Sequence, residues 1–310
     1  MTVFTRKRVV AIAIVVAFVA VFAAVGAVSR STPTPAAPLP SLPWYWTMAV
    51  SPSDADVVVV GTSNGLYRSS DGGKTWRPTG PKGVAATSLV QAGSSLFMGG
   101  VQAAPTASPV IRKGSGRAAP DGAAELASST DGGKTWRVLH PRGLPNVSVQ
   151  ALSVDPANST ALYALLNTGG LYRSTDGARS FQVVSAKVGV PPFALAITQS
   201  HFVGGDMDTG SYVSTNGLVW QRTAFKDSRG GRMVMEYAVE PTDATRILMT
   251  AYGIEMSTDS GKTWHTALKS KVMFGPVAWA SDKSGVAYAI GFDASVWHSG
   301  DGGKSWTKVS

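Results

Sequence analysis

The side chains best suited to chemistry are few, and they gather in the second half of the chain. Asp206 and Asp208 lie in the segment GGDMDTG, and Arg229, Arg232 and Glu236 follow shortly after. Two carboxylates facing each other across a cleft can hydrolyse a glycosidic bond, whereas mixed charges on one surface suit partner binding. The pattern Asp206-x-Asp208 also resembles the start of a calcium loop. The downstream Glu of such a loop is missing, so we predict no metal site.

Composition excludes several other kinds of chemistry. The chain has no Cys and four widely spaced His, which excludes thiol nucleophiles, thiolate-held metals and disulfides, and we predict no cofactor. The formal charge is +9, but four cations flank one N-terminal apolar segment, leaving 9 − 4 = +5 for the remainder. That balance does not indicate a nucleic-acid binder.

Glu236 is the most unusual acidic residue, because it interrupts the small-residue positions of a predicted inner strand. A buried carboxylate is costly unless it is paired. We expect Glu236 to pair with Arg229 or Arg232, to point into a wet central channel, or to face a ligand. The sequence leaves these three readings open.

One short motif recurs along the chain. Near-perfect copies of Ser-x-Asp-Gly-Gly-Lys-Thr-Trp begin at Ser69, Ser129, Ser257 and Ser299, and degraded copies begin at Ser174 and Ser214. The acidic or amide positions are Asp71, Asp131, Asp176, Asn216, Asp259 and Asp301, and the tryptophans are Trp76, Trp136, Trp220, Trp264 and Trp306. The acidic or amide positions are 60, 45, 40, 43 and 42 residues apart. Each period shows four short stretches with β alternation. The sequence therefore predicts an all-β, six-bladed beta-propeller of four-stranded antiparallel blades over residues 44–310.

The motif resembles the Asp-box, or BNR, repeat of sialidases and related propellers. In that family the box joins the third and fourth strands of a blade and is structural, on the rim away from the ligand face. Its glycines permit positive φ, its Asp accepts turn N–H groups and its Trp packs between hairpins. The resemblance implies a ligand face on the opposite side, where Asp206, Asp208, Arg229 and Arg232 would lie.

An insertion in the second unit explains its long spacing. Residues 103–124 are rich in Pro, Ala, Gly and Ser, and we predict a mobile excursion. It carries Arg112, Lys113 and Arg117, which form a candidate arm for an acidic partner. An inert, solvated insertion is the competing interpretation.

The N-terminal region predicts a membrane anchor. Residues 9–28 are twenty consecutive residues without a polar side chain, roughly 30 Å of helix and enough for one bilayer core. The basic tail 1–8 favours a cytoplasmic N-terminus, which places the propeller outside the cytoplasm. Residues 29–43 are rich in Pro and predict a poorly packing stalk. A cleaved signal peptide is the alternative.

Two classes of function fit this architecture. The family's sialidase residues are not recognisable, because the chain has only four glutamates, Glu125, Glu236, Glu240 and Glu255, and no Arg near the first strand. A xyloglucanase-like pair would draw on Asp206 or Asp208 with Glu236 or Asp293. Sortilin-type receptors and photosystem assembly factors, by contrast, are box-bearing propellers that bind peptides or subunits.

We therefore predict a membrane-anchored, extracytoplasmic and non-enzymatic module for protein binding or complex assembly. Its partner would be a protein subunit or peptide, or else a glycan. The alternative is a glycoside hydrolase of sialidase-like or xyloglucanase-like type. Trp44, Trp46, Trp279 and Trp297 lie outside the boxes, and we expect them to pack at the seam between the first and last blades or to stack on a ligand.

Overall fold

The computed structural model describes residues 36–42, 44–102, 111–112, 116–117, 124–188, 193–281 and 285–310. The predicted tail 1–8, the predicted anchor 9–28 and Lys113 lie outside these residues. No helix within the described ranges is long and apolar enough to cross a bilayer. Regular structure in the described ranges is β throughout.

Twenty-four strands lie in the described ranges, most of them in consecutive antiparallel hairpins. The first sheet is β1 (Tyr45–Ser51), β2 (Asp54–Thr62), β3 (Gly65–Ser69) and β4 (Arg77–Thr79). The second is β5 (Val84–Ala92), β6 (Ser95–Gln102), β9 (Ala124–Ser129) and β10 (Arg137–Leu139), with the small pair β7 (Ile111–Arg112) and β8 (Gly116–Arg117) arising from the insertion. The third is β11 (Val149–Asp155), β12 (Asn158–Leu166), β13 (Leu171–Ser174) and β14 (Gln182–Ser185). The fourth is β15 (Ala194–Ile197), β16 (Phe202–Asp206), β17 (Gly210–Ser214) and β18 (Gln221–Arg222).

The remaining strands form one larger sheet, whose order is β19 to β24. They are β19 (Glu236–Glu240), β20 (Asp243–Ser257), β21 (His265–Trp279), β22 (Ala287–Gly291), β23 (Val296–Ser299) and β24 (Thr307–Lys308). The protein is thus a β-propeller with four four-stranded antiparallel blades and one six-stranded sheet, which corrects the prediction of six separate four-stranded sheets.

The merging has a local cause in the sequence. β21 continues from the outer strand of the predicted fifth blade into the inner strand of the sixth, because residues 268–274 contain neither Gly nor Pro. By contrast, the connection after β4 contains Gly80, Pro81 and Gly83, which turn the chain and separate two sheets.

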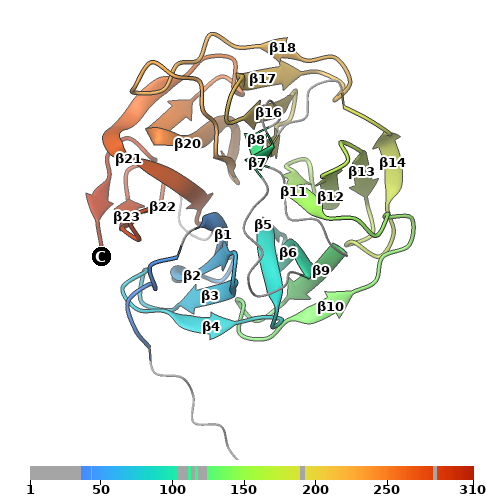
Figure 1. The fold of residues 1–310 in the computed structure, drawn as a ribbon, viewed down its shortest axis with the longest axis horizontal. Coiled ribbons are helices and arrows are strands. Elements are labelled where there is room, and N and C mark those ends of the chain that lie inside the picture. Colours follow the sequence, from blue (N-terminus) through green and yellow to red (C-terminus); the bar gives the residue numbers. More distant parts are fainter. Residues whose placement is uncertain are drawn as a thin grey trace, which may run out of the picture. The chain divides into compact units, whose positions relative to one another are not determined.

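The innermost strands contact one another in a closed order: β1, β5, β11, β15, β19, the end of β21 and β1 again. Figure 1 shows the sheets arranged around this centre like the sectors of a disc. Valine, leucine and alanine fill the spaces between sheets, and Val58, Val60 and Leu162 are fully buried. The alternation noted in the sequence thus serves sheets that are covered on both faces.

The box turns show the hydrogen bonds that the sequence predicted. In the first copy the Asp71 carboxylate accepts the N–H groups of Lys74 and Thr75 at 3.1 and 2.9 Å and the Thr75 hydroxyl at 2.5 Å. Ser69 donates to Asp71 at 2.8 Å and accepts the Gly73 N–H at 2.9 Å. The same pattern recurs at Asp131, Asp176, Asp259 and Asp301.

Each box aromatic packs between neighbouring units. Trp76 lies in a cluster with Tyr45 of the first unit and Tyr288 and Val296 of the last, so it closes the ring. Its indole donates to the Gly73 carbonyl at 2.9 Å. The predicted packing of Trp between hairpins is therefore confirmed.

The last part of the predicted stalk belongs to the propeller. Leu39 is buried in the cluster around Trp76, Ala37 forms a β-bridge with Trp76, and the Tyr45 hydroxyl accepts the Leu42 N–H at 3.0 Å. Packing therefore extends to residues 36–42 and does not begin at residue 44, because Leu39 and Ala37 cover the first box.

Candidate functional site: the central channel and its charged rim

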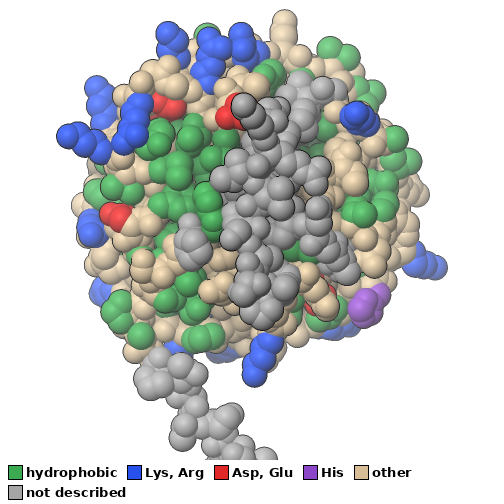
Figure 2. All heavy atoms as spheres, in the orientation of Figure 1, with side chains coloured by type: hydrophobic (Ala, Val, Ile, Leu, Met, Phe, Trp, Pro, Cys, Tyr) green, Lys and Arg blue, Asp and Glu red, His purple; other side chains and the backbone are tan. Residues whose placement is uncertain are grey.

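The inner strands enclose a cavity of about 310 Å³. Its wall comes from all six inner segments and is mostly apolar, with Trp46 and Trp279 among the largest side chains. Figure 2 shows one face of the ring, with a patch of hydrophobic side chains left of centre and Lys and Arg mainly toward the margin. A cavity of this size and lining suits a small group or an inserted side chain.

Hydroxyl groups on the inner strands link each unit to the next. In each link the hydroxyl oxygen accepts a backbone N–H from the neighbouring inner strand. The pairs are Thr47 with Leu89 at 2.8 Å, Ser88 with Leu152 at 2.7 Å and Ser153 with Ile197 at 3.0 Å. The small hydroxyl side chains on these strands therefore form hydrogen bonds between neighbouring sheets as well as packing between them. The sequence did not indicate this role.

Glu236 takes the equivalent position in the fifth unit. One carboxylate oxygen accepts the Val277 N–H at 3.2 Å, and the other accepts the Thr47 hydroxyl at 2.8 Å. Glu236 therefore connects the fifth, sixth and first units around the channel. It lines the cavity, as one of the three interpretations expected. Among the described residues Glu236 forms no ion pair with Arg229 or Arg232, which sets aside that one of the three alternatives.

The charged residues of the fourth and fifth units do meet at one place. The Val234 N–H donates to the Asp206 carbonyl at 2.9 Å, and Arg232 packs beside Gly210. Asp206 itself is buried, and its carboxylate accepts the N–H groups of Asp208 and Thr209 at 2.8 and 2.5 Å. It therefore caps its own turn, while Asp208 and Arg232 remain exposed.

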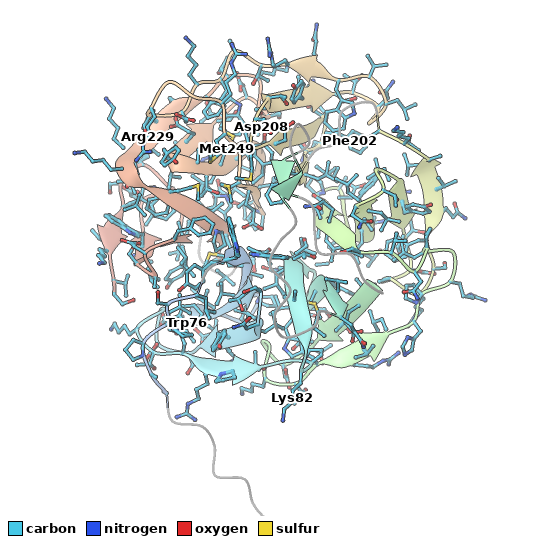
Figure 3. The ribbon with its side chains drawn as sticks, viewed as in Figure 1. Trp76, Lys82, Phe202, Asp208, Arg229 and Met249 are labelled. Atoms are coloured by element: carbon cyan, nitrogen blue, oxygen red, sulfur yellow. The ribbon has the colours of Figure 1, made fainter. Side chains whose placement is uncertain are left out.

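Arg229 is exposed but held in place. Its guanidinium lies 3.7 Å from the centre of the Tyr252 ring and donates to the Lys271 carbonyl at 2.6 Å. Figure 3 labels Arg229 and Asp208 on the sector formed by the fourth and fifth units. We call Asp208, Arg229 and Arg232 the charged rim.

The carboxylates in the channel wall are all engaged within the described residues. Asp155 lies 3.5 Å from Arg173, Glu240 lies 2.7 Å from Arg246, and Glu236 holds the hydrogen bonds above. Asp293, a candidate for the hydrolase alternative, accepts the Ser295 N–H at 3.1 Å and caps a turn. No group of three or more His, Asp or Glu in the described ranges is arranged to hold a metal ion.

Glu255 is an acidic residue whose environment the sequence analysis did not anticipate. Glu255 lies on β20 and is 1% exposed. Burial raises its pKa to about 7, and the negative charge of Asp227 adds to this rise, while a hydrogen bond from Thr266 acts in the opposite direction. Such a pKa suits a general acid. Glu255 does not line the cavity, however, and Asp227 is itself buried. The signal in the sequence was a Glu between Ile254 and Met256 in a predicted strand.

The non-box tryptophans are only partly at the seam. Trp44 packs edge-on against Phe292 of the sixth unit at 5.4 Å, as expected. Trp46 instead packs on Ala85 and Val101 of the second unit, and the Trp279 indole donates to the Ala238 carbonyl of the fifth at 3.0 Å. Trp297 packs within the last sheet, on Phe274. The expected packing at the seam between the first and last units is therefore corrected for Trp46, Trp279 and Trp297.

The insertion residues are described only in part. Arg112 ends β7 and Arg117 ends β8, and these two strands pair with each other. The side chains of both, like the whole of Lys113, lie outside the described part of the chain.

Comparison with known proteins gives two kinds of relative. No family model matches the chain. It is 28% identical over 271 residues to a xyloglucanase from Hypocrea jecorina, covering 84% of this chain and 30% of that protein. It is also 28% identical over 168 residues to an oligoxyloglucan-reducing end-specific xyloglucanase from Emericella nidulans, covering 48% of this chain and 20% of that protein. The chain thus spans less than a third of the length of these curated relatives.

Solved structures of both kinds resemble the fold. An ancestral GH74 enzyme aligns with a TM-score of 0.50 at 14% identity, over 87% of this chain and 41% of that one. YCF48 bound to D1 peptide aligns with a TM-score of 0.49 at 19% identity, over 90% and 85% of the two chains. At 14% identity the likeness to the GH74 enzyme shows the β-propeller fold alone.

Proposed function

We propose that this protein is a binding or assembly module that holds a protein or peptide on one face of the propeller and catalyses no reaction. The observation that carries this proposal is the state of the channel carboxylates. Asp155, Glu236 and Glu240 each hold a cation or a neighbouring strand. A glycosidase needs one carboxyl group free to donate a proton and another free to attack or to activate water.

The charged rim is the proposed binding surface. Asp208 and Arg232 present opposite charges on adjacent loops, and stacking on Tyr252 fixes the guanidinium of Arg229. Preorganised Arg groups lose little side-chain entropy on binding, and mixed charges select a partner by electrostatic complementarity. Arg112, Lys113 and Arg117 of the insertion would add positive charge to the same interaction.

The finer architecture also belongs to this proposal. We infer that the six-stranded sheet is a pair of blades sharing β21, because it contains two box motifs, at Asp259 and Asp301, and two inner segments of the ring. We further propose that residues 9–28 anchor the chain in a membrane, with the propeller outside the cytoplasm.

The test is cross-linking capture from membranes with the full chain. The variant Arg229→Ala/Arg232→Ala should lose most of the captured partner, and Arg77→Ala, an exposed arginine on β4, is the matched control. Equal capture by all three proteins would show that the charged rim is not the binding surface. Failure of the wild-type chain to capture any partner reproducibly would contradict the binding function itself.

A xyloglucan hydrolase is the second candidate, favoured by the sequence similarity to two xyloglucanases. Incubation with xyloglucan oligosaccharides measures it directly through the release of reducing ends. Our proposal expects no release by the wild-type chain. Release that disappears in Glu236→Gln or Asp208→Asn would establish the hydrolase and overturn the binding module.

A further inference from the structure

Large exposed hydrophobic side chains are concentrated in one part of the outer rim. They are Val138 (38% exposed), Val183 (60%), Val184 (37%), Leu218 (50%) and Val219 (75%). All except Val138 lie in the third and fourth units, the two with degraded copies of the repeated motif. Clustered apolar exposure of this kind is typical of an interaction surface.

The outer strand of the third unit differs from its counterparts. β14 is the last strand of its sheet and reads Gln-Val-Val-Ser. The described outer strands of the other units each carry a charge: β4 has Arg77, β10 has Arg137, β18 has Arg222 and β24 has Lys308. Charged residues and Pro on an edge strand discourage pairing with another chain. β14 has neither, so its open edge remains suited to pairing.

The surroundings define how far this edge extends. Just before β14, the Arg142 N–H donates to the Arg179 carbonyl at 3.1 Å, and the Phe181 N–H donates to the Arg142 carbonyl at 2.8 Å. One residue of the chain thus already pairs with the edge at this point. At the other end of β14, Ser185 pairs with Leu171. The turn at Gly217 packs against Leu171, and Leu218 and Val219 come directly after Gly217 in the sequence.

The charge around this edge indicates what kind of partner fits. Arg173 pairs with Gln182 of β14, Arg142 and Arg179 lie just before the strand, and Lys187 follows it. With Asp155, which contacts Arg173, and Asp176 of the preceding turn, the local balance is 4 − 2 = +2. A second copy of this chain would bring the same positive charge to the contact. An acidic segment would instead find complementary charge.

We propose that the edge of β14 receives an extended acidic segment of a partner protein by β-strand addition. Backbone hydrogen bonds to β14 supply the affinity. Alternate apolar side chains of the segment pack beside Val183 on one face of the sheet, since Val184 points to the opposite face. Acidic residues flanking the apolar core meet the arginines. This inference rests on the proposed binding function. It adds a docking site at the outer edge of the third sheet, separate from the charged rim.

The test uses a short synthetic peptide of alternating Val and Thr with Glu at both ends, titrated into the full chain. Fluorescence anisotropy should show saturable binding, and hydrogen exchange should show new protection over residues 181–188. Val183→Lys should weaken binding at least about tenfold, because it places a charge on the edge. Val138→Lys makes the same change on β10 and should leave binding unchanged. Unaltered thermal unfolding of both variants confirms that they fold.

Three results would overturn the proposal. The first is no binding or protection with the wild-type chain. The second is binding that Val183→Lys and Val138→Lys weaken equally. The third is a dimer in sedimentation that Val183→Lys abolishes, which would make a second copy the occupant. Each of these results leaves the charged-rim capture experiment unaffected, so failure here and failure of the proposed function are distinguishable.

Discussion

The turns of the repeated motif are stabilised by local hydrogen bonds, whereas the inner strands around the channel are joined by hydrogen bonds between residues far apart in the sequence. In the rim turns, Asp71 bonds to residues three and four positions away. Around the channel, Glu236 bonds to Val277, 41 residues away, and to Thr47, 189 residues away. Rim turns are therefore stable local units, while the channel wall exists only when the ring is closed.

The same contrast appears in the acidic groups. Partial burial raises the pKa of Asp131, but the Thr135 hydroxyl and N–H, with Ser129 and Lys134, outweigh it and bring that pKa to about 2. Burial instead dominates at Glu255, whose pKa is about 7. The aspartates of the repeated motif stay ionised to low pH, whereas Glu255 is neutral below about pH 7.

The largest expected effect tests whether the glycines in the turns of the repeated motif can be replaced by a residue with a side chain. An added Cβ at Gly133 would lie 2.6 Å from the Val59 Cγ2 atom, at a φ of 79°. We expect Gly133→Ala to lower the free energy of unfolding by about 4 kcal/mol, from backbone strain and overpacking together. Gly177→Ala is the matched control, with a φ of 70° and open space, and should cost about 1 kcal/mol. Chemical denaturation measures both, and equal losses would contradict the packing argument.

The next effect tests the closed ring. Glu236→Ala removes the acceptor for the Thr47 hydroxyl and the Val277 N–H. We expect the free energy of unfolding to fall by about 3 kcal/mol, because both donors lose their partner in the channel wall. Glu236→Gln keeps an acceptor oxygen and should lose about half as much. A loss below about 0.5 kcal/mol for Glu236→Ala would show that the inner ring does not depend on this link.

A smaller effect has the opposite sign. Because the pKa of Glu255 rises from 4.5 to about 7 on folding, ionisation at pH 8 opposes the folded state. We expect Glu255→Gln to stabilise the protein at pH 8 by about 2 kcal/mol, and this gain should vanish as the pH falls from 7 to below 4.5. Glu240→Gln breaks the contact with Arg246 and should destabilise instead. Stability measured across this pH range distinguishes the two, and a pH-independent gain would contradict the raised pKa.

The smallest effect concerns the Asp131 carboxylate in one turn of the repeated motif. Asp131→Ala should cost about 1 kcal/mol at pH 7, comparable with the loss of a helix cap. Since the folded pKa of Asp131 is lowered to about 2 from 3.8, its contribution is complete above pH 4 and is lost as the pH falls toward 2. Asn216 holds its turn with an amide, so the loss from Asn216→Ala should not change with pH. Acid titration of both variants checks this difference.

Sequence reasoning succeeded where interactions are local. The repeated motif predicted the turns and the antiparallel strands, because these depend on residues a few positions apart. It also predicted that Trp76 packs between units, because the motif recurs in every unit, although the partners of Trp76 in the last unit are far away in the sequence. At Glu236 it left three alternatives open, and it could not identify Thr47 and Val277 as hydrogen-bond partners. It also missed the continuation of β21 into the next sheet, although residues 268–274 contain neither Gly nor Pro to turn the chain.

By itself, then, the sequence determined the repeating unit: alternating residues make strands, and Asp, Gly and Trp at fixed spacing make the turns between them. Only the tertiary structure decided which side chains meet across the ring, which acids remain ionised and which edge stays open at β14. The physical reason is distance along the chain. A hydrogen bond across four residues is encoded in the motif itself, whereas one across 189 residues forms only after every unit has taken its place.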